Sequence, residues 1–161
     1  MELQPKNKMI FSILKELDIF SDLDESALIM LSHLFEEKEY LQSTIIFEEG
    51  SIGTSMMVIA QGKVRVSQKA NTNAEEALKV LRTGEIFGEM ALLEDLPRSA
   101  TIIAHTNVII ISIDRSNFLK FLDQDSKNGL KIMLKLAKTL SSRLREADVK
   151  LKTFVHLTQW I

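Results

Sequence analysis

Residues 84–101 contain the side chains of this chain that are best suited to ligand chemistry. Gly88 and Glu89 begin a short apolar helical stretch, and the free amides at such a helix start bind an anion. Pro97 fixes its own φ and favours an extended residue before it, so Arg98 can be directed back to the same place. A guanidinium forms paired bonds to phosphate oxygens, whereas a carboxylate such as Glu89 accepts from a sugar hydroxyl. The two side chains together predict a site for a phosphorylated ribose.

A second interpretation of Arg98 is an ordinary ion pair on the surface, because carboxylates outnumber it in this segment. The four acidic residues are Glu85, Glu89, Glu94 and Asp95. Exposed pairs of this kind are common and contribute little stability. The same acidic excess argues against a general phosphate-binding surface, so a single guanidinium would have to select the ligand.

The rest of the sequence has no pattern typical of catalysis or metal binding. The chain has no cysteine, which excludes disulfides, thiolate ligands and cysteine nucleophiles. Its histidines, His33, His105 and His156, are far apart and never at ligand spacing, so we expect no metal. No Gly-x-Ser-x-Gly turn or comparable nucleophile context occurs, so we predict that the chain is not an enzyme.

Length and composition predict one domain with its own core. The chain has 161 residues, of which 45% are hydrophobic and 26% charged, and a second full domain hardly fits. Its 20 basic and 22 acidic residues give a net charge of −2, so nothing attracts the whole chain to nucleic acid or to an anionic membrane. No apolar run has membrane-spanning length and no signal-peptide pattern opens the chain. We therefore expect a cytoplasmic protein with no membrane partner.

The spacing of apolar residues divides the chain into three zones. Residues 1–35 have helical spacing with a break in the middle, and Ser21 or Asp24 can cap the second helix. Residues 36–114 contain short β-branched runs separated by glycines, and residues 115–161 return to helical spacing. The clearest β runs are 44–47, 56–61, 63–68, 78–81, 101–104 and 108–113. This pattern predicts a mainly β fold, a jelly-roll β-barrel of about eight strands with N-terminal and C-terminal flanking helices.

The last predicted helix has a repeat typical of a coiled coil. Its apolar positions alternate in spacing between four and three residues: Met133, Ala137, Leu140, Leu144, Ala147, Leu151, Phe154, Thr158 and Ile161, with Thr158 the one polar position. Basic residues predominate between positions 127 and 152. We interpret them as the solvated face of a dimerisation helix, the alternative being contact with nucleic-acid phosphates. Aromatic residues are only 6% of the chain and provide no stacking platform, so no direct nucleic-acid binding is expected.

The order Phe-Gly-Glu-Met-Ala-Leu-Leu, three further residues and Pro-Arg-Ser-Ala-Thr occupies residues 87–101. It resembles the phosphate-binding cassette of cyclic nucleotide-binding domains, the family that includes the cAMP receptor protein and the regulatory subunit of protein kinase A. Residues 20–28, 46–50 and 62–66 are similar to other parts of the same domain. The resemblance covers about residues 10–146 and implies a domain of this family without a DNA-binding or kinase domain.

The resemblance also implies a role for each matching residue. Arg98 would bind the cyclic phosphate and Glu89 would accept from the ribose 2′-hydroxyl. The other cassette residues at the ligand would be Phe87, Gly88, Met90, Ala91, Ser99 and Ala100. The base would pack against Val66, Leu78 and Leu81. Candidates for closing over the base are Thr139, Ser142 and Arg143 on the last helix, or Phe154 and Trp160 beyond them.

The chain departs from the family pattern at two turns before the cassette. Acidic residues often follow the turn glycines in the family, whereas here Ser51 follows Gly50 and Thr54 follows Gly53. An expected aromatic residue is replaced by Met57. We expect these positions to lie away from the cassette, so that they influence the stability of the turns rather than ligand binding.

The resemblance implies a sensor that binds cyclic AMP, or less favourably cyclic GMP, as a small-molecule ligand. Ser99 leaves the choice open, because its hydroxyl suits a phosphate and also a guanine amino group. Binding would reposition the C-terminal helices. One alternative is a ligand-independent dimerisation module that uses the barrel as a scaffold. Another is a relative of transcription regulators that lacks the helix-turn-helix; in each case the effector would be a separate, unknown protein.

Overall fold

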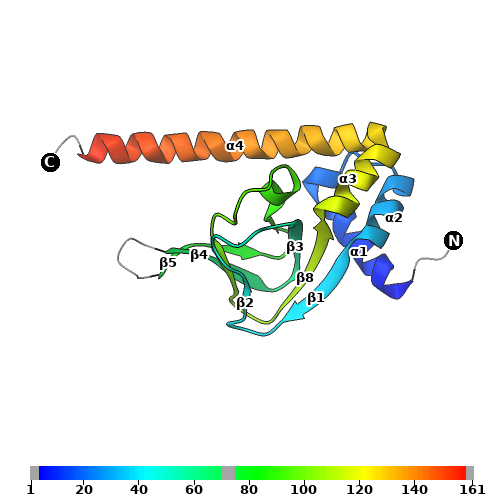
Figure 1. The fold of residues 1–161 in the computed structure, drawn as a ribbon, viewed down its shortest axis with the longest axis horizontal. Helices are drawn as coiled ribbons and strands as arrows, with labels where there is room; N and C mark the ends of the chain where they lie inside the picture. The colour runs from blue at the N-terminus through cyan, green and yellow to red at the C-terminus, as the bar shows by residue number, and fades with distance from the viewer. Residues whose placement is uncertain (1–3, 70–74, 159–161) are drawn as a thin grey trace.

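A computed structural model describes residues 4–69 and 75–158. Its helices are α1 (Pro5–Glu16), α2 (Glu25–Leu34), α3 (Arg115–Gln124) and α4 (Ser126–Thr158), with the 3₁₀ turns η1 (Asp18–Phe20) and η2 (Glu89–Leu92). Its strands are β1 (Glu36–Tyr40), β2 (Ile45–Phe47), β3 (Ser55–Gln61), β4 (Lys63–Lys69), β5 (Glu75–Arg82), β6 (Ile86–Phe87), β7 (Thr101–Ala104) and β8 (Val108–Asp114). Helices thus flank the strands on both sides in chain order, while in space α1, α2 and α3 lie together at one end of the sheets (Figure 1).

The strands form two four-stranded sheets in which all neighbours are antiparallel. Their orders are β1-β8-β3-β6 and β2-β7-β4-β5, so strands distant in the sequence become neighbours. The expectation of about eight strands with flanking helices is confirmed over the described residues. By residue content these residues are not mainly β, because helices contain more of them than strands do and α4 alone has 33. Closure into a single jelly-roll barrel stays a prediction, because the hydrogen bonds divide the strands between two sheets.

Two strands have no counterpart among the runs predicted from the sequence. β1 has the sequence Glu-Glu-Lys-Glu-Tyr and lies at the edge of its sheet, where charged residues discourage pairing with another chain. β6 has only two residues, which pair with Met57 and Val58 of β3. Neither segment has the β-branched alternation that identifies a strand, so partners on other strands, rather than local propensity, determine their conformation.

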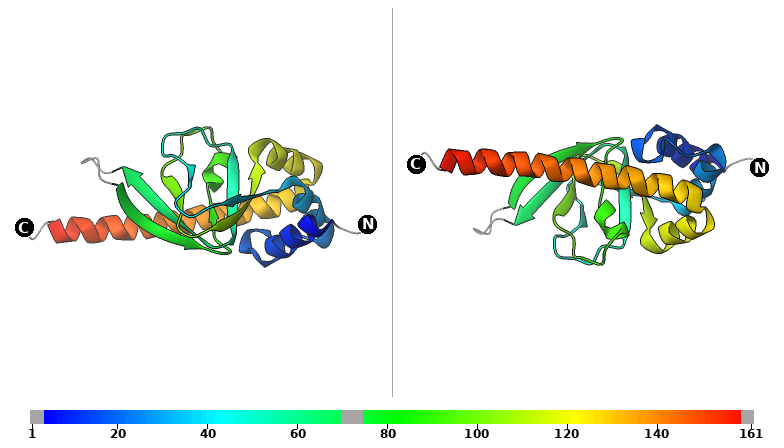
Figure 2. Two further views of the ribbon diagram at one scale, coloured as in Figure 1. Left: turned by 90° about the horizontal axis from the view of Figure 1, so that it is seen from below. Right: turned by 90° about the horizontal axis from the view of Figure 1, so that it is seen from above.

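The two faces of the first sheet contribute to separate hydrophobic cores. Val58 and Ile111 pack with residues of the helices, such as Leu14 and Phe118, whereas their neighbours Ile59 and Ile110 belong to a second core. The second core consists of Ile59, Val64, Leu81, Phe87, Ile102, Ala104, Val108 and Ile110. Because side chains alternate along a strand, β3 and β8 join the helical layer to the second sheet. Figure 2 shows α1, α2 and α3 grouped at one end of the sheets, with α4 running along them.

Asp24 fulfils the capping role predicted for the start of α2. Its carboxylate accepts from the amide of Ala27 at 3.0 Å and from the hydroxyl of Ser26 at 2.7 Å. The hydroxyl of Ser21, the other predicted cap, bonds instead to the carbonyl of Asp18 at 2.8 Å. The first turn of α2 is therefore stabilised by a side-chain oxygen at its orphan amides.

A buried asparagine fastens the start of α4 to the N-terminal helices. Asn128 is 3% exposed, and its Nδ2 donates to the carboxylates of Asp24 at 2.9 Å and Asp125 at 2.8 Å. The bond from Asn128 is the main reason why the pKa of Asp24 lies well below its usual range. About two turns further along, Lys135 donates to Asp18 at 2.9 Å, and this bond raises the pKa of the lysine.

Helix α4 packs on the body of the molecule only through its first part. Ile132 and Leu136 are buried, and Met133 and Leu140 pack beside them against the same core. Every side chain from 141 to 153 is exposed, and α4 extends past the sheets (Figures 1 and 2). The first and third residues of the predicted heptad repeat, Met133 and Leu140, therefore pack within the chain itself, while Ala137 between them is exposed. Its continuation as a coiled coil stays a prediction, and the side chains from Phe154 to Ile161 in the repeat lie outside the described residues.

Candidate ligand-binding site

The cassette begins with a glycine whose conformation and surroundings both exclude a side chain. Gly88 follows β6 with φ +70°, in the left-handed region, and η2 starts at the next residue. A Cβ at Gly88 would overlap Nη1 of Arg98 and lie 3.2 Å from the carbonyl oxygen of Ser55. The helical segment predicted here is thus a single 3₁₀ turn, and the glycine brings its backbone close to Arg98.

Arg98 lies inside the molecule and bonds to backbone carbonyls. The residue is 9% exposed; its Nη1 donates to Gly88 O at 3.2 Å, and its Nη2 donates to Ser55 O at 3.0 Å and Ser55 Oγ at 3.4 Å. The guanidinium carbon stands 4.2 Å from the centre of the Phe47 ring. Burial lowers the pKa of Arg98, and the charge of Glu89 opposes this effect. The guanidinium remains a cation in a largely desolvated position.

The interpretation of Arg98 as a surface ion pair is wrong for the described residues. Three of the four neighbouring carboxylates pair with other cations: Glu85 with Lys79, Asp95 with Arg115 and Glu89 with Arg143. No ion pair joins Arg98 to any of these carboxylates in the part of the chain that the structure describes. The cassette thus holds one cation that is free of a carboxylate contact, as an anion site requires.

Glu89 is the second buried charge of the cassette, and its partner comes from α4. The residue is 4% exposed, and its carboxylate forms an ion pair with the guanidinium of Arg143, whose side chain is 50% exposed. Arg143 Nη2 also donates to the carbonyl of Ile86 at 3.4 Å. In Figure 1, α4 runs directly above the η2 turn. The C-terminal helix therefore contacts the carboxylate that was predicted to bind a ribose.

The three helix residues named as candidates for closing over a base differ in their contacts. Arg143 bonds to the cassette, whereas the hydroxyl of Thr139 bonds to the carbonyl of Lys135 in its own helix at 3.1 Å. Ser142 is exposed. The pairing of Arg143 with Glu89 has no local signal in the sequence, because 54 positions separate the two residues. The side chain of Phe154 and the whole of Trp160 lie outside the described residues.

The expectation that the turns before the cassette lie away from it is wrong. The amide of Arg98 donates to Ser51 O and its carbonyl accepts from Gly50 N, both at 2.8 Å. Gly53 is buried, and a Cβ there would lie 2.5 Å from Cζ of Arg98. Two short backbone bonds thus join the turn to the cassette, although about fifty residues separate them in the chain.

The predicted wall for a base lies on the β4–β5 pair. Leu81 is 7% exposed within the core between the sheets, and Val66 packs partly buried against the same core. The cross-strand partner of Val66 is Lys79, which pairs with Glu85 at 3.6 Å. The side chain of Leu78 lies outside the described residues.

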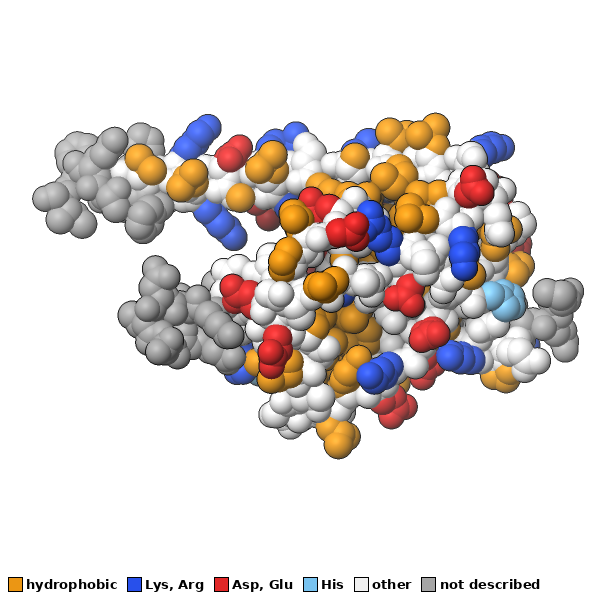
Figure 3. Space-filling model, viewed as in Figure 1, with side chains coloured by type: hydrophobic (Ala, Val, Ile, Leu, Met, Phe, Trp, Pro, Cys, Tyr) orange, Lys and Arg blue, Asp and Glu red, His pale blue; other side chains and the backbone are white. Residues whose placement is uncertain are grey.

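The remaining cassette residues lie at the surface or in the turn itself. Met90 is 48% exposed, whereas Ala91 is buried and its amide donates to Gly88 O at 3.2 Å. The carbonyl of Ser99 accepts from the side-chain amide of Gln68 at 2.7 Å, and Ala100 is half-buried. Phe87, the residue before Gly88, is 4% exposed and belongs to the core between the sheets. Figure 3 shows acidic and basic side chains close together where the cassette region meets α4.

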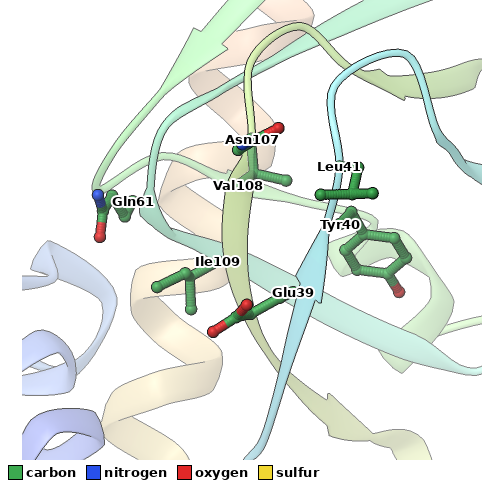
Figure 4. A pocket seen from close by; sticks show the side chains of 7 residues that line it. All are labelled: Glu39, Tyr40, Leu41, Gln61, Asn107, Val108 and Ile109. Carbon is green, nitrogen blue, oxygen red and sulfur yellow. The ribbon is translucent and has the colours of Figure 1, made fainter.

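A cavity of about 360 Å³ lies elsewhere, at the ends of β1 and β8 (Figure 4). Its lining consists of Glu39, Tyr40, Leu41, Gln61, Asn107, Val108 and Ile109. The side chain of Asn107 already accepts from the amide of Gln42 at 2.8 Å. The cavity contains none of the residues predicted to bind a ligand, and its one ionisable group besides the tyrosine is Glu39.

The described part of the chain lacks a metal-binding cluster and a helix suited to spanning a membrane. Residues 4–69 and 75–158 contain no group of three or more His, Asp or Glu side chains arranged to hold a metal ion. None of the helices described combines the length and the apolar character needed to cross a bilayer.

Two antiparallel sheets, flanking helices and a buried arginine and glutamate on one short turn define a regulatory ligand-binding domain. A sequence model described as cyclic nucleotide-binding domain matches residues 37–125, more than half of the chain. The chain belongs to the cyclic nucleotide-binding domain family, as the resemblance of the cassette predicted.

Two relatives with similar sequences are larger proteins whose names refer to different cyclic nucleotides. The chain is 33% identical to the cyclic AMP receptor protein of Thermus thermophilus over 117 residues, 73% of this chain and 52% of that protein. It is 39% identical to the cGMP-dependent protein kinase, isozyme 2 forms cD5/T2, of Drosophila melanogaster over 108 residues, 65% of this chain and 12% of that protein. The chain thus spans about half of the first relative and a small part of the second.

Solved structures of the same family have the same fold. The crystal structure of Thermus thermophilus catabolite activator protein superposes with a TM-score of 0.76 at 30% identity, covering 84% of this chain and 62% of that one. The co-crystal structure of the regulatory domain of Toxoplasma gondii PKA with cAMP superposes with a TM-score of 0.67 at 26% identity, covering 75% and 46%.

Proposed function

We propose that this chain is a sensor that binds a 3′,5′-cyclic nucleotide and transmits binding through its C-terminal helices. The observation that carries the proposal is the burial of Arg98 and Glu89, 9% and 4% exposed, in one cassette. Burying two charged groups is costly, and such groups concentrate at functional sites. The family to which the chain belongs supports the same function.

In this proposal Arg98 binds the cyclic phosphate. Its three bonds to Gly88 and Ser55 use at most three of the five guanidinium N–H groups, so donors remain for phosphate oxygens. Glu89 can only accept, and it would take the ribose 2′-hydroxyl through a carboxylate oxygen not engaged by Arg143. Backbone amides near Ala91, Ser99 and Ala100 would complete the contacts.

We propose cyclic AMP as the preferred ligand and cyclic GMP as the weaker one. The relatives include a protein named as a cyclic AMP receptor and kinases named as cGMP-dependent, so names alone do not select the base. The base would pack against Val66, Leu78 and Leu81. Ser99 would favour guanine if its hydroxyl bonded to the amino group of the base. If the hydroxyl bonded to the phosphate instead, Ser99 would not discriminate between the two bases.

Arg143 provides a route from the site to α4. Glu89 would be shared between the ribose hydroxyl and Arg143, so the ligand would change the free energy of the contact between helix and cassette. Arg143, Ser142 and Thr139 remain the candidates for covering the base. A ligand that favours one position of α4 over another shifts the balance between the two positions.

Titration calorimetry with cyclic AMP and cyclic GMP tests the proposed function directly. Wild-type protein is expected to bind both, and Arg98→Ala to weaken binding by about 2–5 kcal/mol, as for truncating one partner of a buried charge pair. Arg82→Ala removes an exposed arginine from β5 and serves as the matched control. If neither cyclic AMP nor cyclic GMP gives heat of binding at millimolar concentration, the proposal is rejected.

Self-association through α4 is a second candidate function, which can coexist with sensing. Leu144 and Leu151 lie one heptad apart on the projecting part of α4, and they are 64% and 62% exposed. Apolar residues at this spacing are typical of a coiled-coil dimer. Dimerisation independent of ligand, with an effector in a separate protein, would leave Arg98 and Glu89 without a role.

A further inference from the structure

The side chain of Arg98 lies in a compartment built largely by residues outside the cassette. Phe47 from β2, Gly53 from the following turn and Ser55 from the start of β3 surround the guanidinium. We call these three residues the Arg98 pocket. None of them belongs to the sequence pattern by which the cassette is recognised, and no role in ligand binding was predicted for them.

Phe47 forms one wall of the Arg98 pocket. Its ring centre lies 4.2 Å from the guanidinium carbon, a distance at which the face of an aromatic ring attracts a cation. The ring is itself packed against Phe87, with 5.9 Å between the two ring centres. Because Phe87 belongs to the core between the sheets, the position of the Phe47 ring is fixed from behind.

Gly53 makes room for the Arg98 side chain by having no side chain of its own. Its φ is not in the left-handed region, so its backbone conformation is open to alanine. The surrounding space, however, does not admit an alanine side chain, because its Cβ would lie 2.5 Å from Cζ and 2.7 Å from Cδ of Arg98. Overlap with a flexible side chain is relieved by moving that side chain rather than the backbone. An added methyl group is therefore expected to displace Arg98 and leave the turn in place.

Ser55 determines which way the guanidinium plane faces. Its carbonyl and hydroxyl both accept from Nη2, while Gly88 O accepts from Nη1. Bonds to two nitrogens of a rigid planar fork fix its rotation about the side-chain axis. The directions of the remaining N–H groups are then fixed before any anion arrives.

We infer that Phe47, Gly53 and Ser55 are positioning residues that preorganise Arg98 for an anionic ligand. An arginine that moves freely loses rotamer entropy when it binds, whereas one already held in position does not. The inference rests on the proposed function for its link to affinity, since the anion is taken to be the cyclic phosphate. The geometry of the Arg98 pocket does not depend on a ligand, so it can be tested in the ligand-free protein, separately from affinity.

Proton NMR of the ligand-free protein tests the geometry alone. A guanidinium over a ring face is shielded, so the Nε–H resonance of Arg98 is expected upfield of ordinary arginines, with assignment by its loss in Arg98→Lys. Phe47→Leu and Gly53→Ala should each return it to the ordinary position. Ile52→Ala, a change at an 83% exposed neighbour, should leave it unmoved. An unshifted resonance in the wild type overturns the inference.

Calorimetry with cyclic AMP on the same full-length variants tests the link to affinity. Gly53→Ala is expected to weaken binding by about tenfold or more, because a displaced guanidinium no longer meets the phosphate in a fixed geometry. In an Arg98→Lys background the same substitution should cause no further loss, a coupling that a general effect on folding would not produce. Equal losses in both backgrounds, or unchanged affinity in Gly53→Ala, overturn the inference. A shifted resonance in a wild type that binds no nucleotide supports the pocket and rejects the proposed function instead.

Discussion

Replacing Arg143 with alanine is expected to loosen the contact between α4 and the cassette. A fully exposed ion pair contributes about 0.2–1 kcal/mol. The Glu89 side chain is only 5% exposed, however, so the variant leaves a buried carboxylate without its donor. Such an orphaned group costs about 1–3 kcal/mol, and the nearby charge of Arg98 offsets part of this cost. We expect the free energy of unfolding to fall by about 1–2 kcal/mol.

Urea unfolding followed by circular dichroism at pH 7 measures this change. Arg145→Ala is the matched control, because it removes an exposed arginine two positions further along α4 and should change stability by less than about 0.5 kcal/mol. Hydrogen exchange should show faster exchange of amides after Leu140 in Arg143→Ala alone. The slope of the unfolding curve should not change, since the surface exposed on unfolding is nearly the same.

A double-mutant cycle of Arg143→Ala with Glu89→Gln tests whether the ion pair between these two residues couples α4 to the cassette. Glutamine carries no charge that needs a cation, so the loss caused by Arg143→Ala should be smaller in that background. A loss below about 0.3 kcal/mol in the single variant, or equal losses in both backgrounds, would refute the view that this pair couples α4 to the cassette.

Two further predictions concern the two ends of α4. The Asn128→Ala variant should unfold at a lower temperature than wild type at pH 7. The difference between the two unfolding temperatures should shrink as the pH falls below the ordinary pKa of an aspartate. Thermal unfolding between pH 7 and pH 3 tests this, with Lys127→Ala, a change at an exposed position, as the control. The reason is that the bond from Asn128 lowers the pKa of Asp24 in the folded protein. A carboxyl group with such a lowered pKa stabilises the fold at pH values above its pKa in the unfolded chain. This contribution is lost as the pH falls through the pKa of the folded protein. The double variant Leu144→Glu with Leu151→Glu should sediment as a monomer where the wild type sediments as a dimer. Leu41→Glu, a change at a 73% exposed position, should leave the dimer intact. A wild type that sediments as a monomer with and without nucleotide contradicts self-association.

The cassette was predictable because its determinants are local. Gly88 has the positive φ that a glycine before a turn suggests, and η2 begins at the next residue. Asp24 caps α2 as its residue type and position indicated. Each of these features depends on interactions between residues close together in the chain.

The surroundings of Arg98 were not predictable, because strand pairing assembles them. An isolated bridge pairs Ile52 with Pro97, and this bridge brings Gly53 against Arg98. No periodicity or composition identifies which turn will pair with which loop across the sheets. The heptad pattern of α4 did not identify all of its contacts for a related reason, since Ile132 and Leu136, which lie off the repeat, are buried beside Met133 and Leu140. Periodicity shows that a helix has an apolar side but does not say which neighbour covers it.

The length of α4 beyond its packed part has a mechanical consequence. Arg143 lies three residues after Leu140, about 4.5 Å along the helix axis, and Thr158 lies about 27 Å along it. A helix that tilts about its last packed turn moves as a rigid lever. A displacement at Arg143 is then multiplied about sixfold at Thr158, so a shift of half an ångström at the cassette becomes about 3 Å at the far end. A partner held at that end would receive a movement much larger than the one made at Glu89.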